Sequence, residues 1–165
     1  MPRPRAEVRK HMIAGIHRFP RQDEVSYGRA AATVVLERAR AWDARRILIT
    51  TTRSLAATLA RDLAESLGDL CVGVFSEIGA HSPRASVIAG ADVARRCDCD
   101  LIVALGGGSV IDAAKLMQLC LWADLRESDQ LDGYRLGAAG AAERMHAVVP
   151  TLRMIAISRR LRGES

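Results

Sequence analysis

The chain has 165 residues, of which 49% are hydrophobic and 26% charged, and its formal net charge at pH 7 is +5. This length fits one domain, and the apolar content is sufficient for a packed core, which argues against a disordered chain. No apolar run reaches the roughly 18 residues of a membrane-spanning helix, and the amino terminus lacks a signal-peptide core, so we expect a cytoplasmic protein.

The cysteines and the charge distribution argue against a zinc site and against nucleic-acid binding. Four cysteines lack Cys-x-x-Cys spacing, and the pair at 97 and 99 is too close in sequence for a usual zinc site. The excess positive charge gathers near the two ends of the chain, at Arg3, Arg5, Arg9, Lys10, Arg159, Arg160 and Arg162. With few aromatic residues and no DNA-binding motif, we do not expect nucleic-acid binding, and a basic adaptor stays only as an alternative.

Residues 1–24 contain three prolines and have weak periodicity, which predicts a mobile leader with room for one short strand or turn. The domain itself is expected to occupy residues 25–157. Its first helix is predicted over 29–42, because apolar residues recur there at helical spacing. Those residues are Ala32, Val35, Leu36 and Ala39.

A strand is predicted over 46–50, and the chain then turns through Thr51 and Thr52. The carboxyl ends of parallel strands are where ligands bind in open α/β sheets, so these two threonines are candidate binding residues. A helix with Ser54 as its N-cap should follow, and Gly68 is placed to end it.

The next strand is predicted over 70–75, followed by a loop over 76–82 and a helix from Pro83 to Cys97 with Ser82 as its cap. His81 lies alone in that loop, and we expect a structural or exposed side chain there rather than a catalytic one.

The most informative stretch runs from Asp100 to Lys115. A short apolar run over 101–105 predicts a strand buried on both faces, three glycines end it, and helical spacing resumes near Ser109. A glycine turn between a strand and a helix lets backbone N–H groups approach an anion, and the helix N-terminus adds its own free N–H groups. The alternative is a tightly packed turn in which Ser109 caps the helix and Asp112 lies in its first turn.

Helices and strands therefore alternate as far as residue 122, which predicts an α/β fold: a Rossmann-like parallel sheet with helices on both faces. A charged segment over 124–132 and a small-residue loop over 137–142 follow, and one more strand is predicted over 154–157.

The string Gly-Gly-Gly-Ser-x-x-Asp-x-x-Lys after an apolar strand resembles the coenzyme-binding motif of the iron-containing (group III) alcohol dehydrogenases, and among them most of all that of maleylacetate reductases. The resemblance implies that NAD or NADP binds here. Some relatives carry an acidic residue near the position of Thr52 that excludes a 2′-phosphate, so its absence leaves NADP open. The implied roles are pyrophosphate binding by Gly106, Gly107, Gly108 and Ser109, bracing of the turn by Asp112, and contact with the adenosine ribose by Thr51 and Thr52.

The resemblance covers residues 25–157, which is only the amino-terminal half of the family's fold. The family's helical domain supplies the aspartate and histidines that hold a divalent metal, iron or zinc, and we find no such ligands and no catalytic residue in this sequence. In relatives the last strand runs into Pro-Thr-Thr, whereas here residues 158–165 form an aberrant arginine-rich tail. Residues 158–161 can be encoded by codons that, when read two bases later, encode Pro-Thr-Thr. We therefore hypothesise that an insertion or deletion near Ile157 shifted the reading frame.

Taken together, the sequence and the resemblance predict that this chain is the coenzyme-binding half of an NAD(P)-dependent oxidoreductase and that the chain is inactive by itself. Its partners would be a dinucleotide, a second copy in a homodimer, and a small-molecule substrate only if a helical domain is supplied. A stand-alone nucleotide-binding or dimerising module without catalysis is the first alternative, and the basic nucleic-acid adaptor is the second.

Overall fold

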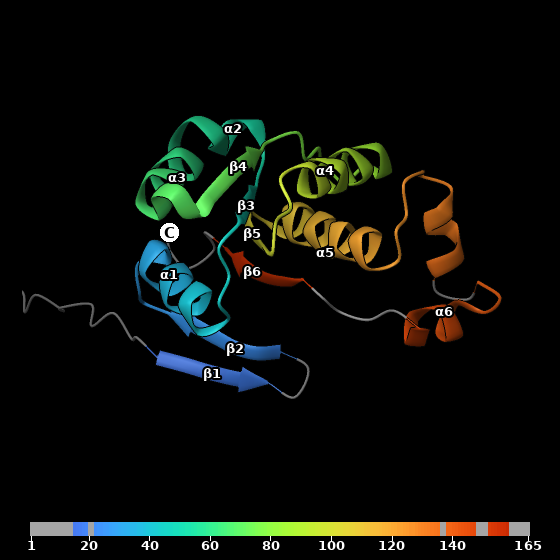
Figure 1. Cartoon of the computed structure of the whole chain (residues 1–165), viewed down its shortest axis with the longest axis horizontal. Helices are drawn as coiled ribbons and strands as arrows, with labels where there is room; N and C mark the ends of the chain where they lie inside the picture. The colour runs from blue at the N-terminus through green and yellow to red at the C-terminus, as the bar shows by residue number, and fades with distance from the viewer. Residues whose placement is uncertain (1–14, 20–21, 136–137, 148–151, 159–165) are drawn as a thin grey trace, which may run out of the picture.

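A computed structural model describes residues 15–19, 22–135, 138–147 and 152–158 of the chain. Its centre is a four-stranded sheet with the order β4-β3-β5-β6, in which every neighbouring pair is parallel (Figure 1). The strands are β3 (Ile47–Thr50), β4 (Cys71–Phe75), β5 (Leu101–Leu105) and β6 (Arg153–Ile157).

Helices cover both faces of this sheet, which confirms the predicted Rossmann-like α/β architecture. On one face lie α1 (Ala31–Ala41) and α3 (Arg61–Leu67), and on the other lie α4 (Arg84–Arg96) and α5 (Gly108–Trp122). The shorter helical elements are α2 (Arg53–Leu55), η1 (Ala56–Ala60), η2 (Gly68–Leu70), η3 (Gln130–Tyr134) and α6 (Ala141–Ala147).

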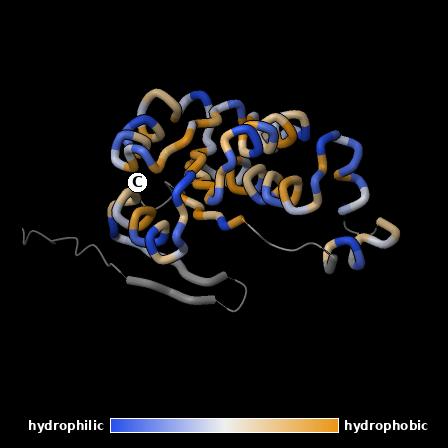
Figure 2. The backbone as a smooth tube through the Cα atoms, viewed as in Figure 1, coloured by the Kyte–Doolittle hydropathy of each residue, from blue (hydrophilic) through white to orange (hydrophobic). Residues whose placement is uncertain are grey.

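The alternation of side chains along the strands divides the interior into two cores. Leu48, Ile102 and Ala104 pack toward α4 and α5, and their sequence neighbours pack toward α1 and α3. All five residues of β5 are buried, because this strand lies between two others and between the two helical layers. Figure 2 shows these strands as the hydrophobic centre of the molecule.

The packing of α4 on α5 depends on small side chains and on one partly buried arginine. A Cβ on Gly90 would lie 2.8 Å from the Sδ atom of Met117, so only glycine lets the two helices come this close. Arg95 donates from Nη2 to the carbonyls of Cys120 and Leu125, at 2.9 and 2.7 Å, and so satisfies the carboxyl end of α5.

Residues 15–19 and 22–24, which the sequence assigns to a leader with room for one short strand or turn, belong to two paired strands in the structure. They lie in an antiparallel hairpin of β1 (Gly15–Phe19) and β2 (Gln22–Tyr27), whose register shifts between residues 17 and 19. Such an irregularity removes the strict alternation by which a strand is recognised in sequence. Residues 1–14 and 159–165, which include the remaining leader and the arginine-rich tail, lie outside the described residues.

Three predicted details of the helices are wrong. The helix expected from Ser54 begins at Arg53 and includes a π-helical turn before α3, and its N-cap position is occupied by Thr52. The N-cap of α4 is Pro83 rather than Ser82. The segment expected as a small-residue loop over 137–142 contains the first residues of α6, which starts at Ala141. In the described part of the chain, no helix is both long and apolar enough to cross a membrane.

One carboxylate connects the beginnings of the two central strands. Asp100 accepts the backbone N–H of Arg45 at 2.8 Å and that of Arg46 at 2.9 Å. The Arg46 guanidinium in turn donates to the carbonyl of Cys97 at 2.7 Å, so the strand starts are tied from both sides. Hydrogen bonds to a charged group are the stronger kind.

We expect Asp100→Ala to lower the free energy of unfolding by about 1.5–3 kcal/mol, because two backbone donors lose a charged acceptor. Urea unfolding measures this. The matched control is Glu65→Ala, which removes a carboxylate from an exposed ion pair with Arg61 on α3 and should change stability by less than about 0.5 kcal/mol. Equal effects of the two substitutions would contradict the role given to Asp100.

Two adjacent threonines at the end of β3 are both fully buried but differ in hydrogen bonding. The hydroxyl of Thr51 donates to the carbonyl of Leu105 at 2.8 Å, and its N–H donates to the carbonyl of Phe75 at 2.8 Å. The hydroxyl of Thr50 has no partner among the described residues. Thr51 therefore joins the carboxyl ends of three adjacent strands, and Thr50 does not.

We expect Thr51→Val to lower the free energy of unfolding by about 1–3 kcal/mol, since it leaves the Leu105 carbonyl without its donor. The isosteric control Thr50→Val removes a buried hydroxyl that has no partner, and it should leave stability unchanged or raise it by about 1 kcal/mol. Thermal or urea unfolding of both variants checks the contrast, and a greater loss from Thr50→Val would refute it.

Candidate functional site

The glycine turn lies where the sequence predicted it, between β5 and α5. Gly106 N–H donates to the carbonyl of Ile157 at 3.0 Å, which fixes the turn to the end of β6. A Cβ on Gly106 would lie 2.7 Å from Cγ2 of Val110, so this glycine allows close packing of the turn against the helix. Gly106 is buried and is thus a structural member of the turn.

Gly107 and Gly108 are exposed, and a Cβ on either would have no atom within 4 Å. Gly107 is the N-cap of α5, and its carbonyl accepts the N–H groups of Val110 and Ile111, at 3.1 and 3.2 Å. Among the described residues, the N–H groups of Gly107, Gly108 and Ser109 have no acceptor. The turn therefore has several backbone donors without an acceptor among the described residues, and it lies at the positive end of a 15-residue helix.

Ser109 does not cap the helix with its side chain, as the alternative interpretation required. Its hydroxyl accepts the backbone N–H of His81 at 3.3 Å, and its carbonyl accepts the hydroxyl of Ser82 at 2.6 Å. His81 and Ser82 both have positive φ angles, of 59° and 50°. The loop after β4 is therefore docked on the first turn of α5, and His81 contributes its backbone there, in line with a structural role.

Asp112 does not brace the turn in the described structure. Its carboxylate lies 3.7 Å from Nζ of Lys115 in an i, i+3 ion pair on the exposed side of α5. Both side chains are more than half exposed, so they are available to a ligand but are not held toward the glycines.

The two predicted ribose contacts differ in accessibility. Thr51 is fully buried and its hydroxyl donates to the carbonyl of Leu105, so it stabilises the end of β5 just before the turn. Thr52 is partly exposed, and its hydroxyl lies 2.9 Å from that of Ser54. Of the two, only Thr52 presents a side chain at the surface beside the turn.

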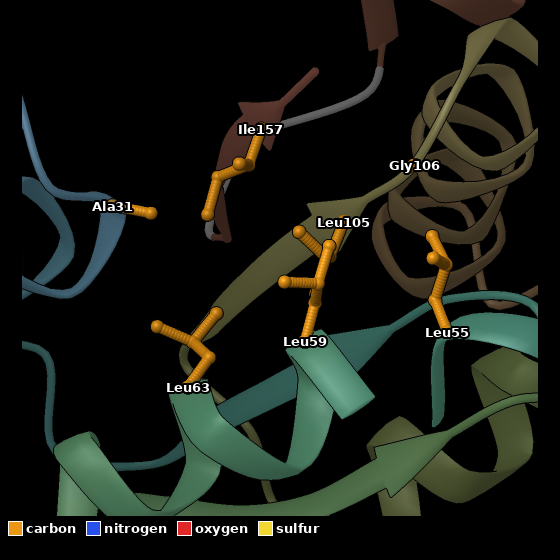
Figure 3. Close-up of a pocket in the computed structure, with 7 residues that line it drawn as sticks. All are labelled: Ala31, Leu55, Leu59, Leu63, Leu105, Gly106 and Ile157. Atoms are coloured by element: carbon orange, nitrogen blue, oxygen red, sulfur yellow. The ribbon is translucent and has the colours of Figure 1, made fainter. Parts of the chain in front are cut away.

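An apolar cleft of about 190 Å³ lies beside the glycine turn, on the face of the sheet that carries α1 and α3. Figure 3 shows leucines of the α2–α3 segment pointing toward the ends of β5 and β6. The cleft is lined by Ala31, Leu55, Leu59, Leu63, Leu105, Gly106 and Ile157. Leu59 is 39% exposed and lies in the lining of the cleft. Nothing in the sequence pattern distinguished these leucines from ordinary core residues.

A charge pair that sequence analysis missed lies at the same edge of the sheet. Arg53 and Glu77 interact through two contacts, one of them a 3.3 Å hydrogen bond from Nε to Oε1. An isolated β-bridge pairs Thr52 with Glu77, which brings the turns after β3 and β4 together. The hydrogen bond from Arg53 holds the pKa of the Glu77 carboxyl below its usual value, so this group is ionised at neutral pH.

The described residues do not fit a metal site. No group of three histidine, cysteine, aspartate or glutamate side chains within them is arranged to hold an ion. Burial raises the pKa of the Cys99 thiol to about 12 and that of Cys120 to about 11, so both are protonated at neutral pH and are poor metal ligands. The basic clusters near the two ends of the chain lie outside the described residues.

A dinucleotide, by contrast, fits the site. Two exposed glycines leave room for a phosphate at the free N–H groups, and an apolar cleft of suitable character for a base lies alongside. A Cβ at either glycine would occupy the space that an anion needs.

Comparison with known proteins agrees with this geometry. A family model described as "Iron-containing alcohol dehydrogenase" matches residues 22–157. A maleylacetate reductase of Sphingobium indicum is 46% identical over 76 residues, which is 46% of this chain and 21% of that protein. Maleylacetate reductase 2 of Cupriavidus pinatubonensis is 48% identical over 63 residues, 36% of this chain and 18% of that protein.

Solved structures of similar proteins have the same fold in this region. The maleylacetate reductase of Agrobacterium tumefaciens superposes with a TM-score of 0.51 at 32% identity, covering 54% of this chain and 25% of that one. A sulfoacetaldehyde reductase of Bifidobacterium kashiwanohense in complex with NAD+ superposes with a TM-score of 0.62 at 23% identity, covering 78% and 32%. The chain spans about a fifth to a third of the length of these relatives. Since the family model matches most of its residues, the chain belongs to the iron-containing alcohol dehydrogenase family.

Proposed function

We propose that this chain is the coenzyme-binding half of an NAD(P)-dependent oxidoreductase, and that the turn over 106–109 binds the pyrophosphate of the dinucleotide. The observation that carries the proposal is the set of N–H groups of Gly107, Gly108 and Ser109, which have no acceptor among the described residues, in a turn whose two glycines are exposed. An anion at this position would accept hydrogen bonds from them and lie at the positive end of α5.

The surroundings of the turn suit the adenosine part of the dinucleotide. The apolar cleft next to Gly106 suits the adenine base, because its lining offers leucine and isoleucine side chains to a flat aromatic ring. We propose that Thr52, at the end of the neighbouring strand, contacts the adenosine ribose. We assign Thr51 a supporting role, since its hydroxyl holds the end of β5.

The bound dinucleotide supplies the hydride chemistry of such oxidoreductases, and the protein binds and orients it. For the whole oxidoreductase we propose NAD(P)H-linked reduction of the maleylacetate reductase type, or alcohol oxidation in reverse. The described residues hold no group suited to a divalent metal, and the chain spans about a quarter of the related reductase structure. We therefore propose that the polypeptide of residues 1–165 binds coenzyme without turnover by itself.

We expect the chain to bind NADH and Gly107→Ala to weaken that binding by about tenfold or more, because the new Cβ occupies the space of the phosphates and keeps them from charge-assisted hydrogen bonds to the backbone N–H groups. NADH fluorescence titration and calorimetry measure the dissociation constant. The substitution should not unfold the chain, since no atom lies within 4 Å of the added Cβ.

The matched control is Gly73→Ala in the middle of β4, a strand that does not lead into the glycine turn. The added Cβ would make an ordinary 3.5 Å contact with Leu48. It should leave the NADH dissociation constant unchanged. Failure of the unsubstituted chain to bind either NADH or NADPH would overturn the proposal. Salt-dependent DNA binding in its place would support the nucleic-acid adaptor.

A further inference from the structure

An ion pair lies at the end of β3, the position at which dinucleotide-binding sites usually distinguish NAD from NADP. NAD and NADP differ only at the 2′ position of the adenosine ribose, where one has a hydroxyl and the other a phosphate. A carboxylate at this edge accepts a hydrogen bond from the hydroxyl and repels the phosphate, whereas an arginine attracts the phosphate. In this chain, residues 51 and 52 at the end of β3 are both threonines and supply neither charge.

Both charges are supplied by the residues immediately around these threonines. Arg53 follows Thr52 in the chain, and the β-bridge between Thr52 and Glu77 brings a carboxylate from the turn after β4 to the same place. Arg53 and Glu77 hydrogen-bond each other, and their side chains are 79% and 53% exposed. An exposed ion pair of this kind is weak and rearranges easily when a ligand offers a better partner.

We infer that Arg53 and Glu77 together set coenzyme choice: Glu77 is the acceptor for the ribose 2′-hydroxyl of NAD, Arg53 is the donor for the 2′-phosphate of NADP, and their mutual pairing leaves the site open to both. This inference rests on the proposed function. While the pair is intact the local net charge is zero, so neither coenzyme meets an uncompensated charge. Removing either partner exposes the other, and the site becomes selective.

The pairing with Thr52 explains why the glutamate from a different turn can act here. The N–H of Thr51 is bonded to the carbonyl of Phe75, and residue 77 is bridged to residue 52, so the two turns run side by side. The loop that continues from Glu77 is in turn fixed on α5 through Ser82 and Ser109. Glu77 is therefore held beside Thr52, in a loop that also contacts the first turn of α5.

The test compares NADH and NADPH dissociation constants for the unsubstituted chain, Glu77→Gln and Arg53→Gln, by fluorescence titration at low and high salt. We expect Glu77→Gln to shift the ratio of the two constants toward NADPH by about fivefold or more, since Arg53 is released for the phosphate. Arg53→Gln should shift the ratio toward NADH by a similar factor, since Glu77 is left unopposed. Arg53→Lys keeps the charge but not the planar donors, and it should retain part of the NADPH affinity.

The controls are Glu65→Gln and Arg61→Gln, which make the same charge changes in an exposed ion pair on α3. They should leave the ratio unchanged. If the unsubstituted chain binds neither coenzyme, the proposed function fails and the inference fails with it. If it binds a coenzyme but both site variants keep the ratio, or shift it in the same direction, only the inference is overturned.

Discussion

The site depends on one constraint, the rigid attachment of the end of β5 to its neighbours. The Leu105 carbonyl accepts the hydroxyl of Thr51, and the next N–H, that of Gly106, donates to the carbonyl of Ile157 in β6. The chain is thus held on both sides at the residue where it leaves the sheet. Among the described residues, the N–H groups that follow Gly106 have no acceptor, so they remain available to a ligand.

The two cores supply the rigidity that this constraint requires. β5 is buried on both faces, and its side chains alternate between the layer of α1 and α3 and the layer of α4 and α5. At the opposite edge of the sheet, Asp100 fixes the start of the same strand to β3. A strand held at both ends and on both faces cannot shift its register, so the position of the turn is fixed before any ligand binds. A preorganised anion site loses little conformational entropy on binding.

Local sequence signals were sufficient for the sheet and for the turn. The apolar run over 101–105 followed by three glycines predicted β5, the turn and α5 because all the residues concerned are adjacent in the chain. The hairpin of β1 and β2 was missed because its strands lack regular alternation and one pairing is irregular. The cap of α4 was wrong because Ser82 uses its hydroxyl for α5, a contact between residues 27 positions apart.

Several residues of the site could not be predicted from the sequence, because their roles depend on contacts between distant parts of the chain. Glu77 lies 24 positions from Arg53, and only the β-bridge between two separate turns brings them together. The leucines of the cleft have the spacing of core residues, and their opening to solvent is a property of the ends of β5 and β6. Thr51 was identified by its place after β3, but whether its hydroxyl faces a ligand or the Leu105 carbonyl depends on strand pairing.

The most direct test of the central claim is a crystal structure of the chain with NAD+ bound. We predict that the pyrophosphate oxygens lie about 3 Å from the backbone nitrogens of residues 107–109, with the backbone of the turn unchanged. A pyrophosphate bound elsewhere on the molecule, with these N–H groups facing solvent, would contradict the account.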